Sequence, residues 1–150
     1  MKYIYIIYEN IEYWIELDKD DYALRQIIVD NGEIEISCKT DCLAEGVILL
    51  DELDGDVKII DNIVFETKWN EVLLNTKTAW EQKKSDYPIG KKVTGTLKYF
   101  YPQGAVIQLE EIQGICANKL PADSTVGSQL QCIVSGYDES NFWIILTLAK

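Results

Sequence analysis

The side chains with the most chemical potential in this sequence are four cysteines, and no histidine accompanies them. Cys38 and Cys42 form a C-x3-C pair, which is not a usual zinc spacing, while Cys116 and Cys132 lie in strand-like runs. A zinc ion held by all four thiolates stays open as an alternative. We expect ordinary reduced, partly buried thiols and no metal.

No catalytic constellation is apparent. Without histidine there is no ready base at neutral pH. The serines lie in no nucleophile-elbow pattern, and no glycine loop could cradle a phosphate. The acidic strings at 17–21 and 51–56 lack the spacing of a calcium-binding EF-hand, so we interpret them as solvated turns. Although the fold could still bring two carboxylates together, nothing nominates a pair, and we expect a non-catalytic protein without a cofactor.

The charge is concentrated in the first part of the chain. Against a total of 25 acids and 14 bases, residues 1–66 hold 17 acids and 5 bases, and residues 67–150 hold 8 acids and 9 bases. The first part should repel polyphosphate, because nucleic-acid affinity comes mainly from lysine and arginine. It should attract a basic protein surface and steer its approach. The alternative is that the charge serves solubility alone.

These residues need elements to position them, and the first 87 residues predict a sheet with one long helix. Two β-hairpins are predicted, one from strands at 2–8 and 11–17 and one from strands at 23–29 and 33–38. In the strand at 11–17, the face with Glu12, Trp14 and Glu16 is expected to be wet. Residues 39–57 suggest a loop with a brief strand at 47–50.

The helix is predicted from apolar side chains at steps of three and four. Asp61 or Asn62 is the expected cap, and Pro88 and Gly90 end the element. The residues that share its apolar face are Phe65, Trp69, Val72, Leu73, Thr76 and Trp80. Residues 1–87 are therefore expected to form an acidic α+β domain.

Residues 88–150 show short strands with turn signals and no helical stripe. Five strands are predicted, at 91–101, 104–109, 112–118, 129–137 and 143–148. Their number and spacing are typical of a small closed barrel. We therefore predict an OB-like barrel as the second domain.

Glycines and small residues in this part carry a family resemblance. They are Gly90, Gly95-Thr96-Leu97, Gly104-Ala105, Gly114-Ile115, Val126-Gly127, Tyr137-Asp138 and Leu146-Thr147-Leu148. With these residues the block resembles a ribosomal S-one-type RNA-binding domain, an OB-fold barrel, over roughly the last 60 residues. The resemblance implies a barrel fold and an ancestry in RNA binding.

The RNA-contact residues of that family are not present. The two aromatic positions are Gln103 and Val106, and the histidine position is Ala117 or its neighbour. The late basic region has become 140–143, Ser-Asn-Phe-Trp. Because each stacked base contributes about 1–3 kcal/mol, losing two platforms should remove much of the affinity.

Other residues of this block favour binding of nucleic acid. Tyr99, Phe100 and Tyr101 could stack bases, and five lysines lie nearby in the sequence: Lys83, Lys84, Lys91, Lys92 and Lys98. The alternative, which we favour, places Phe100 in the core between Tyr99 and Tyr101, with solvated lysines. The nucleic-acid hypothesis nominates Lys91, Lys92, Lys98, Tyr99 and Tyr101.

The prediction from sequence is an acidic inhibitor of immunity type that neutralises a basic toxin or nuclease by protein–protein binding. The nominated contact residues are Asp18, Asp20, Asp21, Asp51, Glu52, Asp54 and Asp56, with Trp14 as an aromatic anchor. An RNA-binding or translation-associated protein is the second candidate, and an adaptor within a larger complex is the third. We expect a cytoplasmic location and no membrane partner, because no signal peptide or membrane-spanning run is apparent.

Overall fold

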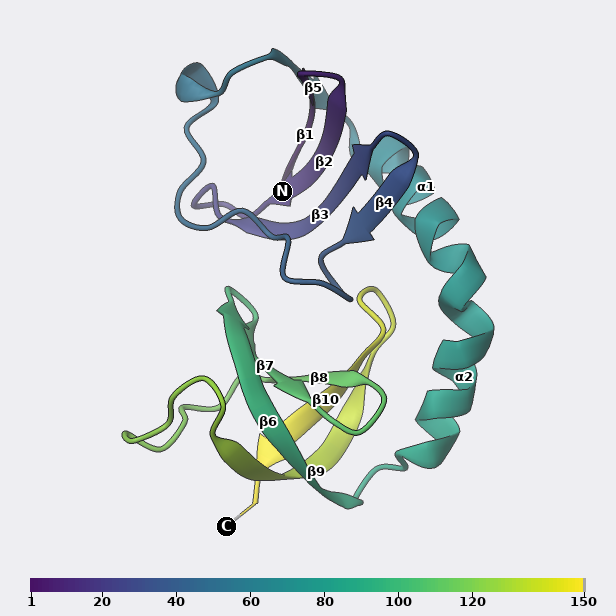
Figure 1. The fold of residues 1–150 in the computed structure, drawn as a ribbon, viewed down its shortest axis with the longest axis vertical. Helices are drawn as coiled ribbons and strands as arrows, with labels where there is room; N and C mark the ends of the chain where they lie inside the picture. Colours follow the sequence, from purple (N-terminus) through teal and green to yellow (C-terminus); the bar gives the residue numbers. More distant parts are fainter. Residues whose placement is uncertain (150) are drawn as a thin grey trace. The chain divides into compact units, whose positions relative to one another are not determined.

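The computed structural model describes residues 1–149 and divides into two compact units, Met1–Asn75 and Thr76–Lys150. The first unit contains β1 (Lys2–Tyr8), β2 (Ile11–Leu17), β3 (Ala23–Asp30), β4 (Glu33–Ile36), η1 (Leu50–Glu52), β5 (Asp56–Ile60) and α1 (Asn62–Leu73). The short turn η2 (Leu74–Thr76) then leads to the second unit. This unit contains α2 (Lys77–Asp86), β6 (Lys92–Tyr101), β7 (Gly104–Gln108), β8 (Gln113–Cys116), β9 (Gln129–Asp138) and β10 (Trp143–Leu148) (Figure 1).

The first unit is built on an antiparallel sheet in the order β4-β3-β2-β1-β5. Its two hairpins are confirmed. Glu9 and Asn10 in the first turn, and Asn31 and Gly32 in the second, all have positive φ. Two-residue hairpin turns require this geometry, and asparagine and glycine adopt it readily.

The predicted long helix is confirmed, with one 3₁₀ turn inside it. The Asp61 side chain caps its start by accepting a hydrogen bond from the backbone N–H of Val64 at 3.1 Å. Phe65, Trp69 and Leu73 of α1 are buried, and Trp80 of α2 is buried further along.

The expectation of a wet face on β2 is wrong, because α1 covers it. Glu16 is only 7% exposed, and it accepts hydrogen bonds from Nε and Nη2 of Arg25 at 2.9 and 2.8 Å. The guanidinium carbon of Arg25 lies 5.0 Å from the ring centre of Phe65 and 5.1 Å from that of Trp69. The carboxylate face is thus an internal layer between the sheet and the helix.

A segment that we call the strap, residues 44–55, covers the opposite face of the sheet (Figure 1). It begins beside β3, where Tyr22 and Val47 form an isolated bridge and the N–H of Ile48 donates to the Asp21 carbonyl. The strand predicted at 47–50 is reduced to that bridge and the turn η1. The strap leads directly into β5, which pairs with β1 and was not predicted.

The second unit is a closed five-stranded barrel in the order β10-β8-β7-β6-β9, compatible with an OB-like fold. All its strands were predicted to within two residues at each end. β10 closes the barrel by pairing parallel to β8 and antiparallel to β9. Trp80 of α2 belongs to the core of the barrel, together with Leu97, Ile107 and Ile144.

The expectation that Phe100 lies in the core between two flanking tyrosines is wrong. Phe100 is 60% exposed, whereas Tyr101 is buried. The register of β6 against β7 shifts between Leu97 and Tyr99. The burial pattern nevertheless alternates along this part of β6, with Leu97 and Tyr101 buried and Lys98 and Phe100 exposed. The period of two from Leu97 therefore assigns Phe100 to the outer side, and the expectation failed because it did not follow that period.

Candidate partner-binding site

The nominated acids of the first unit fall into two groups. Asp18, Asp20 and Asp21 lie in the turn between β2 and β3, and the strap group holds Asp51, Glu52, Asp54 and Asp56 at the strap and the start of β5. Lys2 lies opposite Leu17, next to the turn acids, and Ile7 lies opposite Asp56. The five steps from Lys2 to Ile7 span about 17 Å of extended strand, so the groups occupy opposite ends of the sheet.

Local structure fixes the turn acids. The Asp18 carboxylate accepts from the backbone N–H of Asp20 at 2.8 Å and of Tyr22 at 3.0 Å, which is an Asx-type turn. Asp21 forms an ion pair with Lys2 at 3.1 Å. Two of these three acids are therefore already engaged within the unit.

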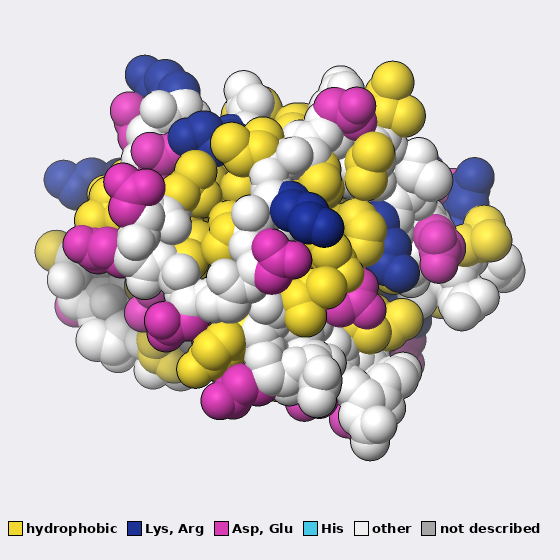
Figure 2. All heavy atoms as spheres, turned by 90° about the horizontal axis from the view of Figure 1, so that it is seen from above, with side chains coloured by type: hydrophobic (Ala, Val, Ile, Leu, Met, Phe, Trp, Pro, Cys, Tyr) yellow, Lys and Arg dark blue, Asp and Glu magenta, His cyan; other side chains and the backbone are white. Residues whose placement is uncertain are grey.

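The strap group is less engaged. Asp51, Glu52 and Asp54 are exposed, and no basic side chain of residues 1–149 forms an ion pair with them. Asp56 lies 4.0 Å from Lys58, a pair that is exposed on both sides and therefore weak. Figure 2 shows acidic side chains scattered between hydrophobic ones on the face it presents, rather than one acidic block.

A pocket of about 470 Å³ lies between the strap and the sheet. Its apolar lining comes from both the sheet and the strap, and the exposed residues Glu45, Glu52 and Asp54 add three carboxylates. The full lining consists of Ile6, Tyr8, Tyr13, Ile15, Gln26, Ala44, Glu45, Val47, Ile48, Leu49, Glu52, Leu53 and Asp54. Sequence reasoning nominated only Glu52 and Asp54 of this set.

Gly55 allows the strap to turn tightly into β5. Its φ is +91°, and a Cβ placed there would lie 2.4 Å from the Ile7 carbonyl oxygen and 2.9 Å from Cβ of Tyr8. Only glycine meets both conditions without strain. The close approach holds the strap acids near the end of β1, beside the pocket.

Trp14 lies away from the strap acids. Its neighbours are Tyr5, with ring centres 4.6 Å apart, and Lys68 of α1, whose Nζ lies 5.5 Å from the indole centre. It therefore packs in the layer between sheet and helix, on the face opposite the pocket. The alternation of side chains along β2 correctly placed Trp14 on the opposite face from Tyr13 and Ile15. It gave no sign that α1 would cover the face that carries Trp14.

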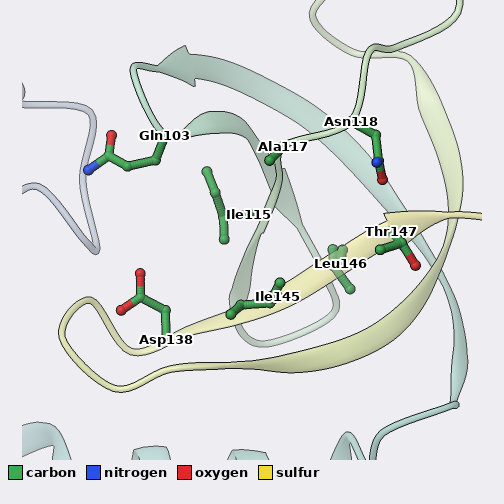
Figure 3. Close-up of a pocket in the computed structure, with 8 residues that line it drawn as sticks. All are labelled: Gln103, Ile115, Ala117, Asn118, Asp138, Ile145, Leu146 and Thr147. Atoms are coloured by element: carbon green, nitrogen blue, oxygen red, sulfur yellow. The ribbon is translucent and has the colours of Figure 1, made fainter.

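The second unit contains a smaller pocket, of about 290 Å³ (Figure 3). Gln103 and Asp138 lie at one end, and Asn118 and Thr147 lie at the other, with Ile115 and Ile145 between them. Gln103 and Ala117 occupy two of the positions where the resembled family carries its RNA contacts, and both line this pocket. Neither side chain offers an aromatic face or a charge.

The loop between β9 and β10, where that family is basic, packs against α2. Glu139 accepts hydrogen bonds at 2.8 Å from the Trp80 indole and the Lys84 ammonium group. These two contacts lower the pKa of Glu139, the lysine contact being the larger cause. Phe142 stacks on Trp80 with ring centres 5.2 Å apart.

The lysines of the nucleic-acid hypothesis are dispersed. Lys83 and Lys84 form ion pairs with Glu111 and Glu139, and Lys91 donates to the Asp86 carbonyl at 2.9 Å. Lys92 and Lys98 are exposed but lie about 20 Å apart along β6. Of the nominated tyrosines, Tyr101 is buried and Tyr99 is half-buried beside it, with ring centres 5.0 Å apart.

Two cysteines lie in each unit, and none of the four forms a disulfide. Burial raises the pKa of Cys42 and Cys116, and it raises the pKa of Cys132 to about 11. These three thiols are therefore mainly protonated at neutral pH, whereas the thiolate is the form that binds metals. Within residues 1–149, no group of three or more histidine, cysteine or acidic residues is placed to hold a metal ion.

Comparison with protein-family models gave no match, and a search of curated proteins found no relative. None of the helices within residues 1–149 has both the length and the apolar character needed to cross a membrane.

Proposed function

We propose that this protein is a non-catalytic inhibitor of immunity type, which binds a basic toxin or nuclease through its first unit. The observation that carries the proposal is the charge of that unit, where residues 1–75 contain 18 acids and 6 bases. The strap acids are exposed and form at most one weak ion pair, so their negative electrostatic potential can act on a partner. Such a field speeds the approach of a basic protein.

The second unit supports the same proposal because, unlike the first unit, its acidic and basic residues are nearly balanced in number. Residues 76–150 hold 7 acids and 8 bases, and several of these form ion pairs with one another. The loop between β9 and β10 is tied to α2 by Glu139 and Phe142. This unit therefore offers little field of either sign, and the first unit is the part that would steer a basic partner.

Association with the product of the neighbouring gene, measured by stopped-flow kinetics, tests the proposal. We expect the rate constant to fall about 10-fold or more between 50 and 500 mM salt, because steering is screened. Neutralising Asp51, Glu52 and Asp54 together should slow association about 10-fold at low salt. Co-expression should also relieve any growth defect that the neighbouring protein causes.

The matched control removes three exposed acids from the second unit, Asp86, Glu110 and Asp123. This control should leave the association rate within about twofold of the original protein, since its charges lie outside the acidic unit. Equal slowing by both triple variants would contradict the proposal, and so would association that does not depend on salt.

RNA binding by an S-one-type barrel is the second candidate, and one observation favours it. Phe100 is 60% exposed and lies two residues along β6 from the exposed Lys98, so an aromatic ring and a cation are close together on the strand. A stacked base could gain about 1–3 kcal/mol from such a ring.

Single-stranded oligonucleotide binding separates the two candidates. We expect no measurable affinity of the full chain at physiological salt, because the lysines are dispersed and the first unit repels phosphate. Fluorescence anisotropy with labelled poly(U) and poly(dT) measures this. Tight binding that weakens steeply with salt, and that is lost in Phe100→Ala and Lys98→Ala, would favour RNA binding instead.

A further inference from the structure

The pocket beneath the strap has the size and composition of a binding site rather than a packing defect. Its volume of about 470 Å³ lies within the range of roughly 300–1,000 Å³ that small-ligand pockets occupy. Ile6 and Ile15 from the sheet and Ile48 from the strap are buried and line it, so its inner surface is apolar. Glu45, Glu52 and Asp54 are exposed and form a charged rim.

Gln26 supplies the pocket with a polar group of fixed orientation. The residue is only 4% exposed and lines the pocket. Its Oε1 accepts a hydrogen bond from the backbone N–H of Ala44 at 2.7 Å, which fixes the orientation of the amide. Its Nε2 has no acceptor among residues 1–149, and it is not one of the fully buried polar atoms that lack a partner, so solvent reaches it. A ligand that brings an oxygen could replace that solvent and accept a hydrogen bond from Nε2.

The same features exclude a charged side chain from the interior of the pocket. A lysine or arginine head inserted there would be desolvated among isoleucines and would meet an amide donor, while the carboxylates lie at the rim. Cations at the rim would stay hydrated and would be attracted without the cost of burial. The geometry thus separates a neutral interior from an anionic entrance.

We infer that this pocket receives a tyrosine side chain from a partner segment in which lysine and arginine flank that tyrosine. The ring fills the apolar interior, the phenol oxygen accepts from Nε2 of Gln26, and the flanking cations face Glu45, Glu52 and Asp54. Central aromatic anchors surrounded by rim charges are the common pattern of strong protein interfaces. This inference rests on the proposed function, for which it specifies the contacting segment.

The probe is the capped tripeptide acetyl-Lys-Tyr-Arg-amide, titrated into the ¹⁵N-labelled full chain at low salt. We expect chemical-shift changes at the amides of Gln26 and of residues 44–54. Two further peptides, Lys-Ala-Arg without the anchor and Glu-Tyr-Glu with reversed charge, should each bind at least about 10-fold more weakly. The variant Glu52→Gln/Asp54→Asn should weaken Lys-Tyr-Arg about 5- to 10-fold.

A matched control variant, Glu33→Gln/Glu35→Gln, removes the same charge from β4, which does not line the pocket. It should leave the affinity for Lys-Tyr-Arg within about twofold. The inference would be overturned if both double variants weakened the binding of Lys-Tyr-Arg equally. It would also be overturned if the peptide changed the amide chemical shifts near all acidic residues of the protein, or changed none of them. Because the tripeptides do not involve the natural partner, they report on the pocket even if that partner fails to bind. Salt-dependent binding of the partner without a pocket response would leave the proposed function intact.

Discussion

Replacing Trp80 with alanine is expected to destabilise the second unit by about 3–5 kcal/mol, the usual cost of deleting a buried tryptophan. Trp80 is 2% exposed within the barrel core. Its ring stacks on Phe142 and meets Tyr137 edge-on with centres 6.2 Å apart, and its indole N–H donates to Glu139. The substitution therefore removes the anchor that joins α2 to the barrel and the loop between β9 and β10.

Hydrogen exchange resolved by peptide is the measurement, because a single unfolding curve could mix the two units. Protection should fall in β6 and β9 and stay unchanged in β1 and β2. Trp80→Phe keeps most of the packing but loses the indole donor, and a cost of about 1–2 kcal/mol is expected. Thr78→Ala, an exposed change in α2, is the control. If Trp80→Ala costs no more than Thr78→Ala, the assigned anchor role of Trp80 is wrong.

Replacing Arg25 with alanine is expected to destabilise the first unit by about 3–5 kcal/mol, because it leaves the buried Glu16 carboxylate without its cation. Arg25 is 6% exposed and also donates from Nη1 to Glu66 at 3.2 Å. Burial disfavours its charge, but the hydrogen bonds to Glu16 and Glu66 outweigh burial and raise the pKa of Arg25. Arg25→Lys should recover only part of the loss, since an ammonium group cannot form the paired contact to Glu16.

A double variant gives a specific signature. If the cost of Arg25→Ala comes from the unpaired buried carboxylate, removing that carboxylate as well should recover part of the lost stability. We therefore expect Arg25→Ala/Glu16→Gln to be more stable than Arg25→Ala alone, as measured by hydrogen exchange in β2 and β3. Glu71→Gln, which breaks the exposed pair with Lys68 at 3.7 Å, should cost less than about 1 kcal/mol. A double variant no more stable than Arg25→Ala would refute the unpaired-carboxylate explanation.

Local patterns were sufficient for most of the fold. Alternating side chains and turn residues such as Asn31-Gly32 identified both hairpins, and short strands with glycines identified the barrel. β5 was missed because Val57, Ile59 and Ile60 follow a run of acids, and their pairing with β1 joins residues some fifty positions apart. A pairing that distant leaves no mark in a local window.

The candidate site could be predicted only in part. Its acids are visible as clusters in the sequence, but the pocket depends on the path of the strap over the sheet. Gln26 carried the available signal, since it is a polar residue within the apolar strand Ala23–Asp30. The role of Arg25 and Glu16 was hidden for a similar reason, because they face each other only once the register of β2 and β3 is known.

The sheet of the first unit ends in two edge strands, β4 and β5, and this has a consequence for self-association. An open edge is a template on which a second copy could add its own strand. β4 is only four residues long and alternates Glu33 and Glu35 with isoleucine. An antiparallel pair of two copies that keeps the isoleucines on one face would therefore set Glu33 against Glu35, which is unfavourable. Part of the acidity of this protein therefore protects it from aggregation, independently of any target that it binds.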